Sequence, residues 1–87
     1  MFKLQVFVTN TCWNCRESER LVEDVAALYP DGEFQILDLN DENRPDNVFA
    51  VPTYVLDGVV IFLGNPTREE LLRLLDEKAT AWDHRIP

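Results

Sequence analysis

The feature that most constrains the fold is a long helical pattern between two short β-rich segments in the first half of the chain. Residues 2–8 and 33–39 are rich in strand-forming side chains, and apolar residues recur at helical spacing between Trp13 and Tyr29. A strand, a long helix and a second strand form a βαβ unit, in which the strands are parallel and the crossover is right-handed. This half of the chain therefore predicts the beginning of an α/β sheet.

A β-hairpin is predicted in the second half of the chain. Residues 54–56 and 59–63 are β-rich, and they are joined by Asp57-Gly58, a dipeptide that favours a type I′ turn. The polar segment before the hairpin is expected to contain one short helix that starts near Asp41.

A final amphipathic helix follows the hairpin. Thr67 and Glu70 have the spacing of a capping box, and the leucines that follow indicate a helix to about Ala79. The predicted order is β-α-β-(α)-β-β-α, which is an α/β fold with a four-stranded mixed sheet and helices on both of its faces. We expect one domain over residues 1–79 and a flexible tail over residues 80–87.

Composition and charge limit the partners of the chain. Its 87 residues are 46% hydrophobic, as in a globular protein with one modest core. The formal net charge of −8 argues against binding to nucleic acid or to anionic membranes, because both would be repelled. The first strand-like run is too short and too polar for a signal peptide or a membrane span. We expect a monomer in the cytoplasm.

Cys12 and Cys15, the two cysteines of the chain, lie where the first predicted strand gives way to the helix. A thiol at the start of a helix faces unpaired backbone N–H groups and the positive end of the helix dipole, and both favour the reactive thiolate. The second thiol follows about one helical turn later, within reach of a small disulfide. In the cytoplasm such a pair is more often catalytic or metal-binding than structural. We interpret Cys12 as a nucleophile and Cys15 as the thiol that resolves its mixed disulfide.

The element order and two motifs resemble the thioredoxin/glutaredoxin superfamily. The motifs are Cys12-Trp13-Asn14-Cys15 after the first strand and Val51-Pro52-Thr53 before the hairpin. The resemblance extends to about Ala79, and it implies a thioredoxin-like fold and a dithiol–disulfide oxidoreductase that reduces or exchanges protein disulfides. It also implies that no metal or organic cofactor is built in, and that the electrons come from a protein reductase or from glutathione.

The same resemblance implies a substrate platform beside the cysteine pair. The Val51–Pro52 bond would be cis, and the backbone of Val51 would bind an extended substrate. Thr53 and Trp13 complete the expected substrate-binding set, although Trp13 could equally pack on its neighbours.

Three departures from the superfamily pattern bear on chemistry. A buried aspartate of thioredoxins is replaced by Val6, and the proline common inside the cysteine motif is replaced by Asn14. Glutaredoxins bind glutathione partly through a Gly-Gly-x-Asp passage and a basic residue before the cysteines, where this chain has Gly64-Asn65-Pro66-Thr67 and Thr9-Asn10-Thr11. The last departure argues against glutathione as a specific ligand.

Two other classes of function remain open on the sequence. The fold could serve as a non-catalytic adaptor that carries a vestigial cysteine pair. The pair could also bind a metal ion or cluster between two chains, because two cysteines are too few for a four-ligand zinc site in one chain. Reduction of insulin disulfides and metal analysis of anaerobically purified protein distinguish these classes.

Overall fold

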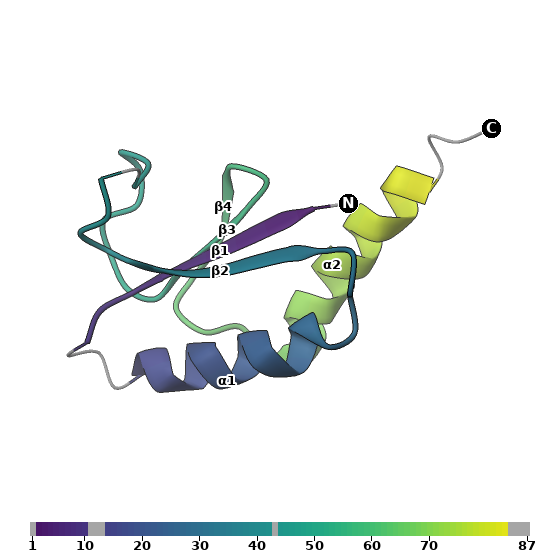
Figure 1. The fold of residues 1–87 in the computed structure, drawn as a ribbon, viewed down its shortest axis with the longest axis horizontal. Helices are drawn as coiled ribbons and strands as arrows, with labels where there is room; N and C mark the ends of the chain where they lie inside the picture. The colour runs from purple at the N-terminus through teal and green to yellow at the C-terminus, as the bar shows by residue number, and fades with distance from the viewer. Residues whose placement is uncertain (1, 11–13, 43, 84–87) are drawn as a thin grey trace.

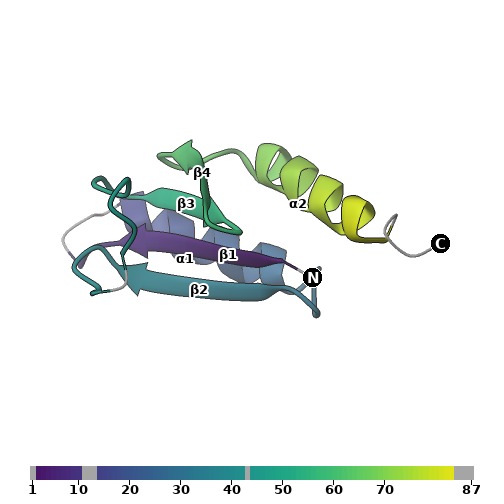
Figure 2. The same cartoon turned by 90° about the horizontal axis from the view of Figure 1, so that it is seen from above.

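The computed structural model describes residues 2–10, 14–42 and 44–83, with side chains as far as Ala79. The elements are β1 (Lys3–Val8), α1 (Asn14–Ala26), β2 (Glu33–Asp38), β3 (Thr53–Leu56), β4 (Val59–Leu63) and α2 (Arg68–Asp83). The four strands form one sheet in the order β2-β1-β3-β4 (Figure 2). Strand β1 is parallel to β2 and antiparallel to β3, and β3 is antiparallel to β4. The predicted α/β fold with a four-stranded mixed sheet is confirmed.

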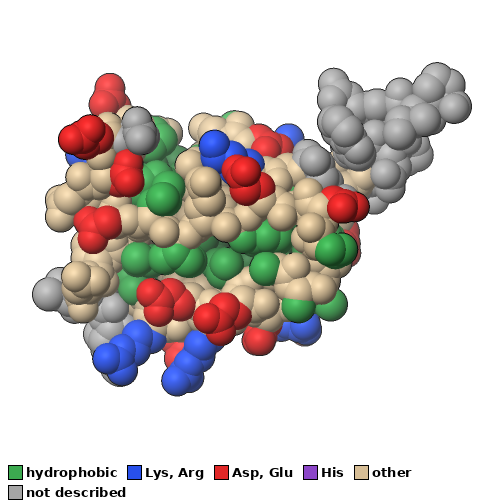
Figure 3. All heavy atoms as spheres, in the orientation of Figure 1, with side chains coloured by type: hydrophobic (Ala, Val, Ile, Leu, Met, Phe, Trp, Pro, Cys, Tyr) green, Lys and Arg blue, Asp and Glu red, His purple; other side chains and the backbone are tan. Residues whose placement is uncertain are grey.

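Both helices lie on one face of the sheet (Figure 1). Leu4 and Val6 of β1 share a buried cluster with Val25 of α1 and with Leu71 and Leu75 of α2. Leu4 and Val6 alternate with Lys3, Gln5 and Phe7 along β1, so these three side chains point to the opposite face of the sheet. Figure 3 shows hydrophobic side chains in a band between the sheet and α1, with charged side chains on the outer surface of the helix. The expectation of helices on both faces is wrong.

The opposite face of the sheet carries a smaller apolar cluster. Phe7 of β1 and Val55 of β3 pack there against Val48, which belongs to the connection between β2 and β3. The short helix expected near Asp41 is absent from the described parts of this connection, residues 39–42 and 44–50, which form turns and bends.

Hydrogen bonds between residues three apart close these turns. The N–H of Asp41 donates to the carbonyl of Asp38 at 2.9 Å, and the N–H of Val48 donates to the carbonyl of Pro45 at 3.0 Å. Pro45 has no N–H and disfavours helical geometry at the residue before it, so the turns cannot merge into one helix.

The hairpin turn forms as predicted. Asp57 and Gly58 have φ angles of 48° and 85°, the positive values that a type I′ turn requires at both central residues. The carboxylate of Asp57 accepts a hydrogen bond from the backbone N–H of Lys3 at 2.8 Å and lies 3.1 Å from the ammonium group of Lys78. The turn is thereby fixed to the start of β1 and to α2.

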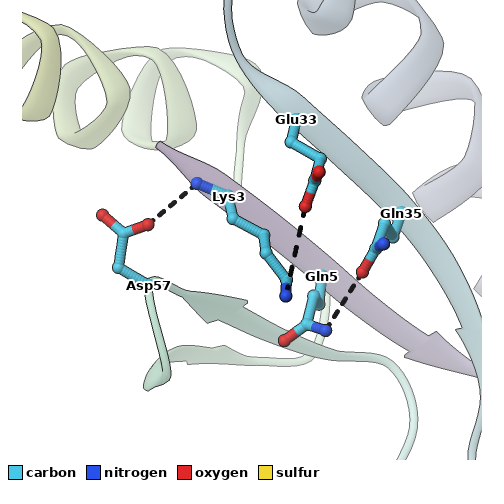
Figure 4. A network of polar contacts seen from close by, with 5 residues as sticks. All are labelled: Lys3, Gln5, Glu33, Gln35 and Asp57. Atoms are coloured by element: carbon cyan, nitrogen blue, oxygen red, sulfur yellow. Dashed lines mark hydrogen bonds and ion pairs between the residues drawn. The ribbon is translucent and has the colours of Figure 1, made fainter. Parts of the chain in front are cut away.

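The helix-free face of the sheet is polar at the end where β1 starts. Figure 4 shows Lys3 beside Glu33, with 4.0 Å between the charged groups, and the amide of Gln5 donating to that of Gln35 at 3.1 Å. These pairs join β1 to β2, whose residues are directly in register. The face therefore changes from polar to apolar along β1 toward Phe7.

The two helices end at positions other than those predicted. Helix α1 ends at Ala26, and the N–H of Leu28 then donates to the carbonyl of Val25 at 2.9 Å in a tighter turn. Helix α2 continues past Ala79 to Asp83, because no glycine or proline interrupts the chain there. Residues 80–83, expected in the tail, are therefore helical, and residues 84–87 lie outside the described set.

The predicted capping box forms at the start of α2. The N–H of Glu70 donates to the hydroxyl of Thr67 at 3.1 Å, and the N–H of Thr67 donates to the carboxylate of Glu70 at 3.0 Å. The hydrogen bonds from Thr67 lower the pKa of Glu70, because they favour its charged form.

Both tyrosines of the chain have raised pKa values, so they should ionise at higher pH than free tyrosine. Burial and a hydrogen bond to Asp76 of α2 raise the pKa of Tyr29 from 10.0 to about 12, and burial raises the pKa of Tyr54. A raised folded pKa means that the stabilising contribution of Tyr29 is complete below pH 10.0 and is lost as the pH rises toward about 12. We expect Tyr29 to stay protonated in the folded protein near pH 10.0 and to ionise normally in denaturant.

The variant Asp76→Asn is the control for this titration, because it removes the charge beside Tyr29 and keeps a hydrogen-bond acceptor. It should lower the pKa of Tyr29 toward its ordinary value. Ionisation of Tyr29 near pH 10.0, while circular dichroism still reports the native fold, would contradict the assignment.

Candidate functional site

The candidate site lies at the start of α1. Cys15 is the second residue of this helix and is 3% exposed, in the core cluster that also contains Val8 at the end of β1. It is not a free thiol in the structure. Cys12 and Trp13, the other residues predicted for this loop, lie outside the described residues.

The predicted platform segment packs against the same cluster as Cys15. The Val51–Pro52 peptide bond is cis, as predicted, and Val51 is half-buried against the cluster. The carbonyl of Pro52 accepts a hydrogen bond at 2.8 Å from the N–H of Gly64, at the start of the loop between β4 and α2. The structure thus places Val51 against the core cluster that contains Cys15.

Thr53, the last residue of the predicted platform, is buried like Pro52 before it. It is fully buried, and its hydroxyl donates to the carbonyl of Ala50 at 2.6 Å. The structure gives Thr53 a role in holding the turn before β3.

A polar network beside Cys15 was not predicted from the sequence. Asn65 follows Gly64, and its side-chain oxygen accepts hydrogen bonds from the hydroxyls of Ser18 and Tyr54, the latter at 3.0 Å. Its side-chain nitrogen donates to the carbonyl of Asn14 at 2.8 Å. Ser18 is fully buried one helical turn after Cys15, and a serine on the apolar face of a helix was the available signal in the sequence.

The interior near Cys15 is uncharged. Among the described residues, the buried polar side chains are Ser18 and Thr53, and Val6 is fully buried in the core. Burial raises the pKa of Tyr54, while its hydrogen bond with Ser18 acts in the opposite direction. The charged side chains of the first turns of α1 are exposed. The support of the site is therefore made of neutral hydrogen bonds and the start of the helix.

Two large apolar side chains near the predicted platform segment are exposed. Phe49 is 73% exposed just before Val51, and Leu63 is 67% exposed just before Gly64. Such exposed apolar side chains near a site are available for contact with a partner.

The described residues contain neither a metal-binding cluster nor a helix that could cross a membrane. No group of three or more His, Cys, Asp or Glu side chains is arranged there to bind a metal ion. None of the described helices has the length and apolar character needed to cross a membrane.

The mixed sheet, the helix that starts at the cysteine motif and the cis proline before the hairpin define a thioredoxin-like α/β fold. Residues 2–76 match the thioredoxin domain family. The chain belongs to this family, and it is a thiol–disulfide oxidoreductase.

Relatives of known name agree with this assignment. The chain is 32% identical over 81 residues to a thioredoxin of Methanocaldococcus jannaschii, covering 87% of this chain and 94% of that protein. It is 30% identical over 80 residues to a probable thioredoxin of Methanothermobacter marburgensis, with the same coverage of 87% and 94%.

Solved structures show the same fold. Fasciola hepatica thioredoxin superimposes with a TM-score of 0.71 at 24% identity, over 87% of this chain and 79% of the other. A mutant thioredoxin from Halobacterium salinarum gives a TM-score of 0.70 at 25% identity, over 87% of this chain and 73% of the other.

Proposed function

We propose that the protein reduces protein disulfides through Cys12 and Cys15, with Cys12 as the nucleophile. The observation that carries this proposal is that α1 begins at Asn14 with Cys15 buried in its first turn. The burial of Cys15 favours the role of resolving thiol for this residue. Cys12 precedes the helix in the sequence, where unpaired N–H groups and the helix dipole favour a thiolate.

The proposed reaction moves two electrons from the cysteine pair to the substrate. The Cys12 thiolate attacks one sulfur of the substrate disulfide, the substrate S–S bond breaks, and a mixed disulfide forms while the other substrate sulfur leaves as a thiolate. Cys15 then loses its proton and attacks the sulfur of Cys12. The Cys12–Cys15 disulfide forms and the second substrate sulfur leaves as a thiolate. One substrate sulfur takes the proton that Cys15 loses, and the other takes a proton from water, because Cys12 reacts as a thiolate.

The substrate in this proposal lies along Val51 and Pro52 as an extended segment. Trp13, Phe49 and Leu63 supply apolar contacts around it. The net charge of −8 favours partners that offer a basic rim around an apolar centre. The protein would act in the cytoplasm as a monomer, without a metal or organic cofactor.

The test of this function is the reduction of insulin disulfides, together with a thiol titration of the protein across redox buffers. We expect catalysed insulin reduction and a reversible two-electron transition of the cysteine pair. An adaptor with a vestigial pair would show no catalysis.

We expect a protein reductase, and not glutathione, to be the better reductant of this protein. Glutathione is an anion that needs cationic and backbone anchors, and this chain lacks the basic residue before Cys12 and the Gly-Gly-x-Asp passage. Its charge adds repulsion within the screening length of about 8 Å. A reductase of the thioredoxin-reductase type should therefore reduce the oxidised protein faster than glutathione at its physiological concentration. The measurement compares the two rates of reduction side by side. Faster reduction by glutathione would mean that the protein uses the same reductant as glutaredoxins do.

A further inference from the structure

We propose that Asn65 is a positioning residue of the thiol–disulfide site, which fixes the peptide group between Asn14 and Cys15. This inference rests on the proposed function, because it concerns the reactivity of the Cys12–Cys15 pair. It assigns a role in the redox reaction to the loop between β4 and α2.

The hydrogen bonds of Asn65 fix the orientation of its amide. Its oxygen accepts from two hydroxyls, those of Ser18 and Tyr54, and both of these residues are fully buried. With the oxygen held there, the amide nitrogen points to the carbonyl of Asn14, 2.8 Å away. The reverse orientation would place the amide oxygen against that carbonyl, so one orientation satisfies all three contacts.

The bond to Asn14 acts on the start of the helix. The carbonyl of Asn14 and the N–H of Cys15 belong to the same planar peptide group. Because α1 begins at Asn14, the N–H of Cys15 lies in the first turn of the helix, at the positive end of the helix dipole. A hydrogen bond to the carbonyl fixes the plane of this group and polarises its N–H. It therefore strengthens the local field that favours a thiolate at the helix start.

The same loop also fixes the platform. Gly64 donates its N–H to the carbonyl of Pro52 at 2.8 Å, and its φ of 93° is a conformation that few side chains tolerate. Two adjacent residues, Gly64 and Asn65, thus hold Pro52 and the first turn of α1 at a set separation. Gly64 holds the platform through its backbone, and Asn65 holds the helix through its side chain.

The test compares Asn65→Ala with Asn47→Ala, the same substitution at an exposed position in the connection between β2 and β3. The first readout is the pH dependence of iodoacetamide labelling of the reduced protein, which gives the apparent pKa of the faster thiol. The second is the rate of insulin reduction. We expect Asn65→Ala to label about three- to tenfold more slowly at neutral pH and to show a raised apparent thiol pKa, in line with the loss of the hydrogen bond to the carbonyl of Asn14. Asn47→Ala should match the wild type.

Two further variants keep the inference testable. Ser18→Ala removes one bond that orients Asn65 but leaves its bond to Asn14, so it should shift the thiol pKa in the same direction by less. If Asn65→Ala does not fold, Asn65→Ser replaces it, because the serine side chain is too short to reach Asn14.

The outcomes separate this inference from the function on which it rests. If a folded Asn65 variant labels at the wild-type rate with the wild-type thiol pKa, and the wild-type protein reduces insulin, the positioning role alone is overturned. A wild-type protein that does not reduce insulin would overturn the proposed function, and the positioning role with it.

Discussion

Replacing Cys12 with serine should reduce insulin-disulfide reduction to the uncatalysed background. A serine hydroxyl is not ionised at neutral pH and cannot form a mixed disulfide, so the first step is lost. Cys15→Ser is the matched variant, because it makes the same chemical change one helical turn away. It should retain the first attack, lose turnover, and accumulate mixed disulfides with substrates that are visible on non-reducing gels.

The order of labelling tests the same assignment without a mutation. Cys12 of the reduced protein should react with iodoacetamide before Cys15 near neutral pH, since Cys15 is 3% exposed in the structure. Peptide mapping that finds faster labelling at Cys15 would reverse the two roles. Equal trapping of mixed disulfides by both serine variants would do the same.

Leu71→Ala should cause a large loss of stability. Leu71 is fully buried in the cluster between the sheet and the helices, and removal of its side chain leaves a cavity there. Such substitutions cost about 2–5 kcal/mol of the free energy of unfolding, out of a total of roughly 5–15 kcal/mol for a domain. Alanine is a good helix former, so the cost should come from packing and not from helix propensity.

Leu63→Ala is the control for this prediction. It removes the same atoms from a side chain that is 67% exposed, so it should cost less than about 1 kcal/mol. Urea unfolding followed by circular dichroism gives both values. Similar losses for the two variants would contradict the placement of Leu71 in the core.

Features that depend on neighbouring residues were predictable from the sequence. Asp57-Gly58 specifies its turn through the φ angles that these two residues tolerate, and Thr67 and Glu70 bond to each other across one helical turn. The pairing of β1 with β2 follows from the long helix between them. The start of α1 near the cysteine motif was also predictable, because it follows from the local helical pattern. The roles of Cys12 and Trp13 remain predictions.

Features that depend on distant contacts were not predictable. Asn65 bonds to Ser18 and Asn14, which lie far away in the sequence, and the local pattern around Asn65 indicates only a turn. The expected short helix is absent from the described residues between β2 and β3 for a similar reason. Its local signals were weak, and the packing of Val48 against Phe7 and Val55 fixes the connection in a different form.

The covering of the helix-free face has a consequence for local unfolding. The described part of the connection between β2 and β3 holds this face through Val48, whose carbonyl accepts a hydrogen bond from the guanidinium of Arg44. Few apolar contacts need to break for such a segment to open, so its amides should exchange with solvent well before those of β1 and β3. The segment leads directly into Val51 and Pro52. We therefore expect the segment before Val51 to adjust to partners of different shape, while the loop at Gly64 and Asn65 keeps Pro52 and the start of α1 in place.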